Sequence, residues 1–218
     1  MAEVTVIESK IANLGSLVRA FETIGVTVEV SKDPRVICKA RRLVLPGVGA
    51  FAAGMDELKK NELNFVLGDV VAKGTPLLGI CLGMQLLLDS SEENGVTRGL
   101  GLIQGKVIKI PSVNTFGVRE RKVPHIGWSA IFPSSKKQGW ECSSLSTTDS
   151  GDFFYFVHSY RVSLANPKDS SAECDYSGVA ITAALSKNNI TGLQFHPERS
   201  GPKGLEILRA FARSDTID

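Results

Sequence analysis

The stretch that most constrains the fold is residues 75–89, which read TPLLGICLGMQLLLD. Gly74 and Pro76 end any helix or strand that precedes this stretch. The apolar run 77–80 has the length of a buried strand, and residues 84–88 are good helix formers. Cys81 lies between strand and helix with a glycine two residues away on each side. This pattern is typical of a tight strand-to-helix turn that holds a nucleophile in a strained backbone conformation. The sequence therefore predicts a reactive cysteine at the end of a buried strand.

Such a position would activate Cys81 in two ways. Peptide dipoles at a helix N-terminus favour the thiolate over the thiol, and the backbone N–H of Leu82 would point toward an oxyanion formed when the sulfur attacks a carbonyl. The alternative interpretation is a buried cysteine in a glycine-flanked core turn. Residues 79–83 alone favour neither interpretation.

The first half of the chain alternates between strand-like and helix-like segments. We expect strands at residues 4–7, 26–30, 43–45 and 77–80, and helices at 14–24, 58–66 and 84–88. The alternation predicts an α/β fold with a mostly parallel central sheet, helices on both faces, and function at the carboxyl ends of the strands. With 218 residues, 43% of them hydrophobic, the chain has the size of a single domain over residues 1–218.

From Gly95 onward the pattern changes to short strand-like segments joined by turns. These segments are residues 106–110, 128–132, 153–158, 179–185 and 192–195. Because no long helical pattern separates them, they predict an antiparallel extension of the same sheet. A last helix over residues 205–211 follows the turn at Gly201 and Pro202, and the polar stretch 134–151 predicts a surface loop.

A glycine-rich loop, Pro46-Gly47-Val48-Gly49, directly follows the third predicted strand. In a parallel sheet this loop lies at the same edge as Cys81. Glycines on both sides of Val48 allow unusual backbone dihedrals, so the loop could turn an N–H toward a developing oxyanion. Taken alone, it would be interpreted as an ordinary glycine-rich turn.

His196 and Glu198, in the sequence QFHPE at residues 194–198, form a second candidate group. Pro197 restricts the residue before it to extended conformations, in which residues i and i+2 project to the same side. A glutamate beside an imidazole can fix its tautomer and stabilise the imidazolium, as a histidine base for a cysteine nucleophile requires. The other two histidines have no carboxylate at this spacing, so we expect His196 to be the base. The alternative is a structural histidine at a strand end.

Composition argues against several classes of protein. The 25 basic and 23 acidic residues are well mixed and give a formal net charge of +2, so no footprint for nucleic acid or an anionic membrane is visible. The apolar start is too short for a signal peptide and no apolar run approaches a membrane span, which predicts a cytoplasmic protein. The four cysteines show no metal-type spacing and are expected to be reduced in that compartment.

The motifs PGVG at residues 46–49, GICLG at 79–83 and QFHPE at 194–198 resemble those of the class I (triad) glutamine amidotransferases. Three further segments are similar to one branch of that family, the glutaminase subunits of imidazole glycerol phosphate synthases in histidine biosynthesis. They are KVPHIGWS at 122–129, YFVHSY at 155–160 and HPERSG at 196–201. The resemblance covers nearly the whole chain. Relatives that act in purine, pyrimidine, folate or pyridoxal phosphate pathways carry different residues in these three segments.

The resemblance implies a role for each motif. Cys81 would be the nucleophile, His196 the general base and acid, and Glu198 the residue that orients His196. Gly49 and Leu82 would supply the N–H groups of the oxyanion hole. The residues implied to hold glutamine are Gly47, Gln85, His158, Ser159 and Tyr160.

The implied reaction is hydrolysis of glutamine to glutamate and ammonia, with no metal and no organic cofactor. The family passes its ammonia to a cyclase subunit that makes imidazole glycerol phosphate and an aminoimidazole carboxamide ribotide, so the resemblance implies a heterodimer with that cyclase. Asn13, Trp128 and Arg199 lie in or beside segments that resemble the family's partner-facing surface. Where many members have Asp-Tyr-Gly-x-Gly-Asn after the first strand, this chain keeps only Asn13.

Two other hypotheses fit the same fold. A stand-alone cysteine hydrolase of γ-glutamyl compounds would turn over fully without a partner. A non-catalytic binding or redox-sensing module would use Cys81 only as an oxidisable thiol. The pairing of His196 with Glu198 argues against the module, because redox sensing does not require it.

Overall fold

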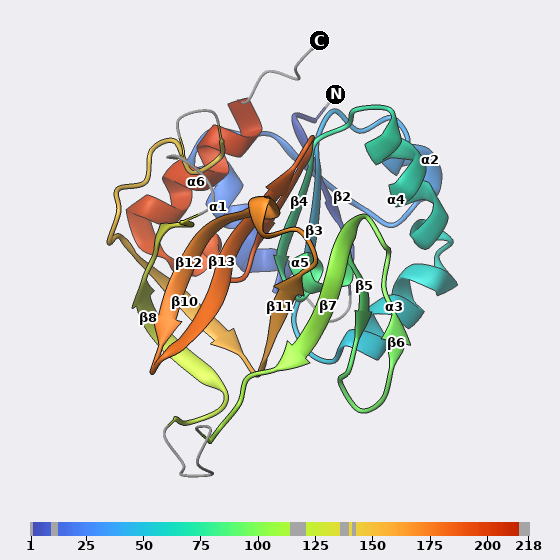
Figure 1. Cartoon of the computed structure of the whole chain (residues 1–218). Coiled ribbons are helices and arrows are strands. Elements are labelled where there is room, and N and C mark those ends of the chain that lie inside the picture. Colours follow the sequence, from blue (N-terminus) through green and yellow to red (C-terminus); the bar gives the residue numbers. More distant parts are fainter. Residues whose placement is uncertain (1, 10–12, 114–120, 136–139, 141–142, 214–218) are drawn as a thin grey trace.

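The computed structural model describes residues 2–9, 13–113, 121–135, 140 and 143–213, and its centre is an eight-stranded sheet (Figure 1). In spatial order the strands are β2 (Val28–Ser31), β1 (Val4–Ile7), β3 (Leu43–Gly47), β4 (Leu77–Cys81), β14 (Ile190–Leu193), β13 (Val179–Lys187), β12 (Ser170–Tyr176) and β9 (Phe132–Pro133). The first five run parallel to one another, and the last three continue the sheet in antiparallel pairing. The predicted α/β fold with a mostly parallel sheet and an antiparallel extension is therefore confirmed.

Helices cover both faces of this sheet (Figure 1). One face carries α1 (Leu14–Thr23) and α6 (Gly201–Arg213), and the other carries α2 (Pro34–Ile37), α3 (Phe51–Lys60) and α4 (Leu63–Ala72). Among the helices of the described residues, none is both long and apolar enough to cross a bilayer.

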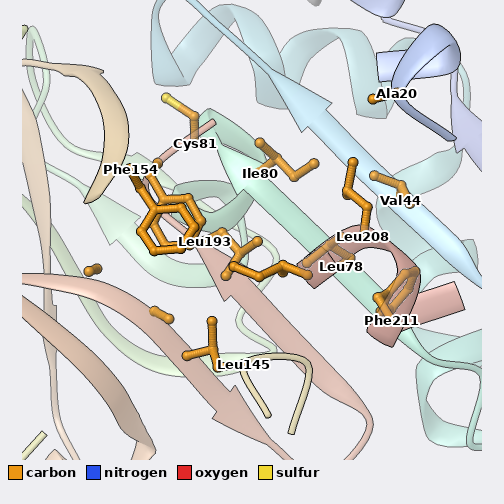
Figure 2. Packing of buried hydrophobic residues seen from close by; sticks show 14 of the residues in the cluster. Ala20, Val44, Leu78, Ile80, Cys81, Leu145, Phe154, Leu193, Leu208 and Phe211 are labelled. Carbon is orange, nitrogen blue, oxygen red and sulfur yellow. The ribbon is translucent and has the colours of Figure 1, made fainter. Parts of the chain in front are cut away.

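Successive residues of the central strands face different cores. Val44 packs in the cluster under α1 and α6, whereas its neighbours Leu43 and Leu45 pack in the cluster under α3 and α4. Figure 2 shows the first cluster, with Leu78 and Ile80 along β4 and the sulfur of Cys81 at the end of the same strand. Burial on both faces explains why the central strands are apolar runs rather than alternating sequences.

The expectation that every late strand extends the main sheet was wrong for residues 106–110, 128–130 and 153–158, whereas Phe132, the last residue of the expected strand 128–132, begins β9 of the main sheet. A four-stranded sheet contains β11 (Tyr160–Leu164), β7 (Ile103–Lys109), β5 (Leu88–Ser91) and β6 (Thr97–Arg98), and a two-stranded ribbon contains β10 (Phe153–His158) and β8 (His125–Ala130). Buried and exposed residues alternate along β7, so this strand covers the core with one face only. Residues 192–195 also differ, because β14 inserts between β4 and β13 and is parallel to β4.

Several helix boundaries depart from the sequence-based expectation. The expected helix 58–66 is two helices, α3 and α4, which are separated where Glu62 adopts a left-handed φ of 59°. The expected helix 84–88 is α5 (Leu82–Leu86), and β5 begins at Leu88. The short α2 was not predicted; its first turn contains Pro34 and is capped by the Asp33 side chain, which accepts from the N–H of Arg35.

The polar stretch 134–151, predicted to be a surface loop, contains a buried residue among those that the structure describes. Trp140 is buried, and its indole N–H donates to the carbonyl oxygen of Ser171 at 2.8 Å. This residue anchors the segment to β12, so the interpretation from polarity alone was wrong at that position.

The turn around Cys81 is fixed by two close backbone approaches. A Cβ atom on Gly83 would overlap the carbonyl oxygen of Leu45 in β3, and a Cβ on Gly79 would lie 2.8 Å from the backbone nitrogen of Met84. Between them, Cys81 has φ 53° and ψ −109°. This is the strained nucleophile conformation that the glycine spacing predicted.

We therefore expect Gly83→Ala to lower the free energy of unfolding by about 3 kcal/mol or more, at the upper end of overpacking costs, because the obstacle is backbone. The matched control is Gly68→Ala in α4, where a Cβ meets nothing within 4 Å. That substitution should raise stability by about 0.5–1 kcal/mol, since glycine is unfavourable inside a helix. Urea unfolding of both variants tests the argument, and similar effects would contradict it.

Candidate active site

The sheet brings the glycine-rich loop, the turn at Cys81 and the segment with His196 together at the carboxyl ends of β3, β4 and β14. In the pairing of β3 with β4, Gly47 lies opposite Cys81, and in the pairing of β14 with β4, Leu193 lies opposite Ile80. The loop after β3, the turn after β4 and the segment after β14 therefore all leave the sheet at the same end, the expected location for function in a parallel sheet.

Cys81 is buried, with 5% of its surface exposed, and its sulfur has two polar contacts. The thiol can donate to the carbonyl oxygen of Val157 at 3.8 Å, and the side-chain amide of Gln194 donates to the sulfur at 3.7 Å. The sulfur is thus held between β10 and the segment after β14 rather than exposed on the surface.

His196 and Glu198 form a buried pair beside this cysteine. The Nδ1 atom of His196 lies 2.8 Å from Oε1 of Glu198, and both side chains are 5% exposed. Because a carboxylate only accepts, Nδ1 carries the hydrogen. The sequence predicted an extended segment here. The structure differs, because Pro197–Arg199 form a 3-10 turn, η2. That turn folds Glu198 back onto the ring.

The second ring nitrogen of His196, Nε2, is buried and has no hydrogen-bond partner among the described residues. Burial by itself lowers the pKa of His196, but interactions with Cys81 and Glu198 outweigh it and raise the pKa to about 10. His196 is therefore an imidazolium at neutral pH. The arrangement can deliver a proton from Nε2.

The backbone of His196 is clamped on both sides. Its N–H donates to the carbonyl oxygen of Tyr155 at 2.9 Å, and its carbonyl accepts from the hydroxyl of Ser200 at 2.6 Å. The Ser200 oxygen in turn accepts from the N–H of Tyr155 at 3.0 Å. The ring is thus fixed relative to β10.

Three of the residues expected to hold glutamine meet at one carbonyl. The Tyr160 carbonyl oxygen accepts from Nε2 of Gln85 at 3.1 Å and from Nδ1 of His158 at 2.7 Å. Ser159 lies between His158 and Tyr160 in the chain, and its own carbonyl accepts from the N–H of Ile110. Gly47 packs on the start of α5, where an added Cβ would lie 3.1 Å from Cβ of Leu82.

The two residues expected to form an oxyanion hole lie at the same sheet end. Leu82 is the first residue of α5, and Gly49 has a φ of 97° that suits glycine. The residues after the loop are anchored, because the N–H of Phe51 donates to Oε2 of Glu93 at 2.7 Å. A carboxylate at the start of α3 is favourable there, since Ala50 provides no side-chain cap.

Sequence reasoning missed Gln194 and Glu93. The signal for Gln194 was an amide within the expected strand 192–195 and two residues before His196; it directly follows β14 and is completely buried. A buried amide requires partners, so this position could have been singled out. Nothing in the local sequence indicates that Glu93 reaches α3.

The ribbon of β8 and β10 presents an apolar face to solvent, which we call the outer face. Trp128 lies opposite Tyr155 in the ribbon, and the outer face consists of Ile126, Trp128, Ala130, Phe153, Tyr155 and Val157. Ile126, Trp128 and Phe153 are 58%, 53% and 59% exposed. The Arg199 guanidinium lies 4.3 Å from the centre of the Tyr155 ring.

The three residues expected at a partner interface are distributed as follows. Trp128 is on the outer face, and Arg199 adjoins it through Tyr155, whose ring centre lies 6.1 Å from that of Trp128. Asn13 is exposed and caps α1, with its side-chain oxygen accepting from the N–H of Ser16 at 3.4 Å. Because α1 packs against η2, Asn13 belongs to an element next to Arg199.

The chain is similar to known glutamine amidotransferases along almost its whole length. Residues 5–214 match the model of the family "Glutamine amidotransferase class-I". The chain is 41% identical over 213 residues to imidazole glycerol phosphate synthase subunit HisH 1 of Legionella pneumophila (strain Lens), covering 97% of this chain and 99% of that one. It is 40% identical over 208 residues to subunit HisH of Bacillus subtilis (strain 168), covering 95% and 94% of the two chains.

Solved structures share the fold at much lower identity. PurLQS from Thermotoga maritima superimposes with a TM-score of 0.68 at 16% identity, covering 95% of this chain and 96% of that chain. A glutamine amidotransferase from the same organism gives a TM-score of 0.61 at 17% identity, covering 99% of this chain and 85% of that chain.

The pKa of His196 predicts a specific dependence of stability on pH. Its value of about 10 lies above the ordinary 6.5, so its contribution to stability is complete below pH 6.5 and is lost as the pH rises through about 10. Glu198→Gln removes one cause of the raised pKa, so the midpoint for His196 should fall, and the loss of stability should be smaller and should end at a lower pH. NMR titration and urea unfolding between pH 6 and 10.5 measure both.

The same titration contains an internal control. Burial lowers the pKa of His125 to about 4 and that of His158 to about 3, so neither should titrate in this window. An unchanged His196 midpoint in Glu198→Gln would contradict the assigned cause.

Proposed function

The chain belongs to the class-I glutamine amidotransferase family, and we infer that it hydrolyses glutamine to glutamate and ammonia as the glutaminase subunit of an imidazole glycerol phosphate synthase. The observation that carries this inference is the buried pair of His196 and Glu198, 2.8 Å apart, in the segment that leaves the sheet at the same end as Cys81. Similarity to HisH subunits over nearly the full chain supports the choice of branch. On this proposal residues 1–218 form one amidotransferase domain that works in the cytoplasm.

The first chemical step is attack of the Cys81 sulfur on the side-chain amide carbon of glutamine. A C–S bond forms, the C=O electron pair moves to oxygen, and the backbone N–H groups of Gly49 and Leu82 stabilise that oxyanion. The strained turn holds the sulfur at the carboxyl end of β4, where the loop after β3 begins.

The second step uses the proton on His196. Nε2 of the imidazolium gives its proton to the amide nitrogen, the C–N bond breaks, and ammonia leaves a γ-glutamyl thioester on Cys81. Neutral His196 then takes a proton from water, which attacks the thioester and releases glutamate and the thiolate. Glu198 keeps Nδ1 protonated throughout, so Nε2 is the only nitrogen that exchanges protons.

The contacts of Gln85 define how it can bind glutamine. Both hydrogens of its Nε2 have acceptors, the carbonyl of Tyr160 and Oε1 of Gln194. Its own oxygen therefore remains the group that can contact substrate, and an acceptor suits the α-ammonium group of glutamine. The backbone of Ser159 and Tyr160 lies beside it and would hold the rest of the amino-acid end, with Gly47 lining the site at the start of α5.

We place the cyclase subunit on the outer face of the β8–β10 ribbon. Large exposed aromatic and aliphatic side chains gathered on one face are typical of a protein interface. Asn13 and Arg199 would form its polar border. The face is close to the chemistry, because Tyr155 holds the backbone of His196 and the Val157 carbonyl contacts Cys81. A stand-alone hydrolase would leave this apolar face uncovered.

Removal of the triad residues tests the assignment of chemistry. Cys81→Ala should abolish glutamine-dependent synthesis by the complex while synthesis from added ammonium salts continues, because only the ammonia source is lost. His196→Ala should lower kcat about a hundredfold or more, and Glu198→Ala should cost less. Glutamate release and product formation are measured with and without the cyclase. Glutaminase activity in pure Cys81→Ala protein would refute the assignment.

Substitution on the outer face tests the partner surface. Trp128→Ala should weaken binding of the cyclase at least tenfold, as expected for a central aromatic residue of an interface. The control is Phe65→Ala, because Phe65 is 76% exposed on α4, away from the ribbon. Calorimetric titration with purified cyclase gives both dissociation constants. Equal affinities for the two variants would place the interface elsewhere.

A further inference from the structure

A chain of buried polar contacts runs from the inner side of the β8–β10 ribbon to the nucleophile. It begins at Ser129, whose hydroxyl lies 2.9 Å from Nε2 of His125, and continues from Nδ1 of His125 to Nε2 of His158 at 3.0 Å. His158 and Gln85 meet at the carbonyl of Tyr160. Gln85 then contacts Oε1 of Gln194 at 3.0 Å, and Gln194 contacts the sulfur of Cys81 at 3.7 Å.

The Tyr160 carbonyl fixes the direction of every contact on the cysteine side. A carbonyl oxygen only accepts, so the Gln85 atom beside it must be the amide nitrogen. That nitrogen also faces Gln194, so the Gln194 atom there must be the amide oxygen. The remaining end of the Gln194 amide, which faces Cys81, is therefore an N–H donor.

The same carbonyl also fixes the direction of the hydrogen bonds from His158 to Ser129. His158 must donate from Nδ1 to Tyr160, so in neutral His158 the Nε2 atom accepts from Nδ1–H of His125. His125 then accepts from the Ser129 hydroxyl at its own Nε2. Both rings are neutral because burial lowers the pKa of His125 to about 4 and the pKa of His158 to about 3.

The surroundings hold these groups in place. Gln194 is completely buried, His125 is 1% exposed and His158 is 6% exposed. The His125 ring stacks between Phe156 and Tyr176, with ring centres 4.8 Å and 4.0 Å away. Buried polar groups with so little freedom keep one pattern of hydrogen bonds.

We propose that Gln194 is a further catalytic residue whose amide N–H stabilises the Cys81 thiolate, and that Gln85, His158 and His125 are positioning residues that keep this N–H on the sulfur. An anionic sulfur accepts a stronger hydrogen bond than a thiol, so the contact favours the attacking form. The role of Gln194 in turnover rests on the proposed glutaminase function. The effect of its N–H on the Cys81 sulfur is independent of that function and can be tested on the chain alone.

The first experiment measures the pH dependence of Cys81 alkylation by iodoacetamide, quantified on the Cys81 peptide by mass spectrometry. Gln194→Met removes the donor, and the midpoint should rise by about one pH unit, as expected for a hydrogen bond to a charged group. His196 and, behind it, Glu198 are the charged groups that also act on Cys81, and both stay unchanged. The control Asn189→Leu removes a part-buried amide that donates to Val71 and Thr75 outside the site, and its midpoint should not move.

A midpoint equal to that of wild type in folded Gln194→Met would overturn the role of Gln194. Gln194→Glu provides a second route if the methionine variant does not fold. Glutamate can still accept from Gln85 but presents oxygen to the sulfur, so its midpoint should rise further than that of the methionine variant. An unchanged midpoint in the glutamate variant would also overturn the proposal.

The second experiment separates positioning by His158 from simple packing. In His158→Asn the amide nitrogen can replace Nδ1 and donate to Tyr160, whereas in His158→Gln the amide reaches the position of Nε2 and that donor is lost. Positioning predicts kcat/KM at least tenfold higher, and a Cys81 midpoint nearer to wild type, for asparagine than for glutamine. Packing predicts the reverse order, because glutamine fills more of the space. The reverse order, or equal values, would overturn the positioning role.

The two proposals can fail separately. A wild-type chain that releases no glutamate from glutamine, with or without cyclase, would refute the proposed function. The alkylation midpoints of the Gln194 and His158 variants would still decide whether this hydrogen-bond chain acts on Cys81.

Discussion

The contact between α5 and β3 at Gly83 is the constraint on which the rest of the site depends. There is no room for a side chain between Gly83 and the Leu45 carbonyl, so the helix can follow the strand only through a turn of unusual dihedrals at Cys81. That turn makes Leu82 the first residue of α5 and directs the Gln85 side chain toward Tyr160 and Gln194. Strain at one residue is stable here because packing on both sides determines it.

The site also carries an unusual concentration of buried polar side chains. Each would destabilise the fold if it lacked a partner, yet each described amide and imidazole in the chain from Ser129 to Cys81 has one. Burial lowers the pKa of His125 to about 4 and that of His158 to about 3, so neither ring adds a positive charge that would oppose the imidazolium of His196. Apolar surroundings thus set the charge state of the site as directly as its ionised groups do.

The sequence predicted the parts of this molecule that local rules control. Glycine spacing identified the turn at Cys81, and apolar runs identified the central strands, because burial on both faces leaves no alternation. The antiparallel ribbons were assigned to the wrong sheet, since strand pairing over long separations has no local signature. Gln194 and Glu93 were missed for a related reason: their partners, Cys81 and Phe51, lie 113 and 42 residues away. Residues 10–12, which precede Asn13 in the altered segment after the first strand, lie outside the described residues.

The position of β14 has a consequence for the folding of the chain during its synthesis. This strand lies between β4 and β13, and the segment after it brings Gln194 to the sulfur of Cys81, 113 residues earlier in the chain. During synthesis, Cys81 leaves the ribosome long before residues 190–198, and until they arrive β4 lacks one neighbouring strand. A nascent or C-terminally truncated chain therefore has neither the imidazolium nor the amide beside its thiol. On the proposed function, such an unfinished chain lacks the group that would protonate the leaving ammonia, so the order of the strands ties activity to completion of the fold.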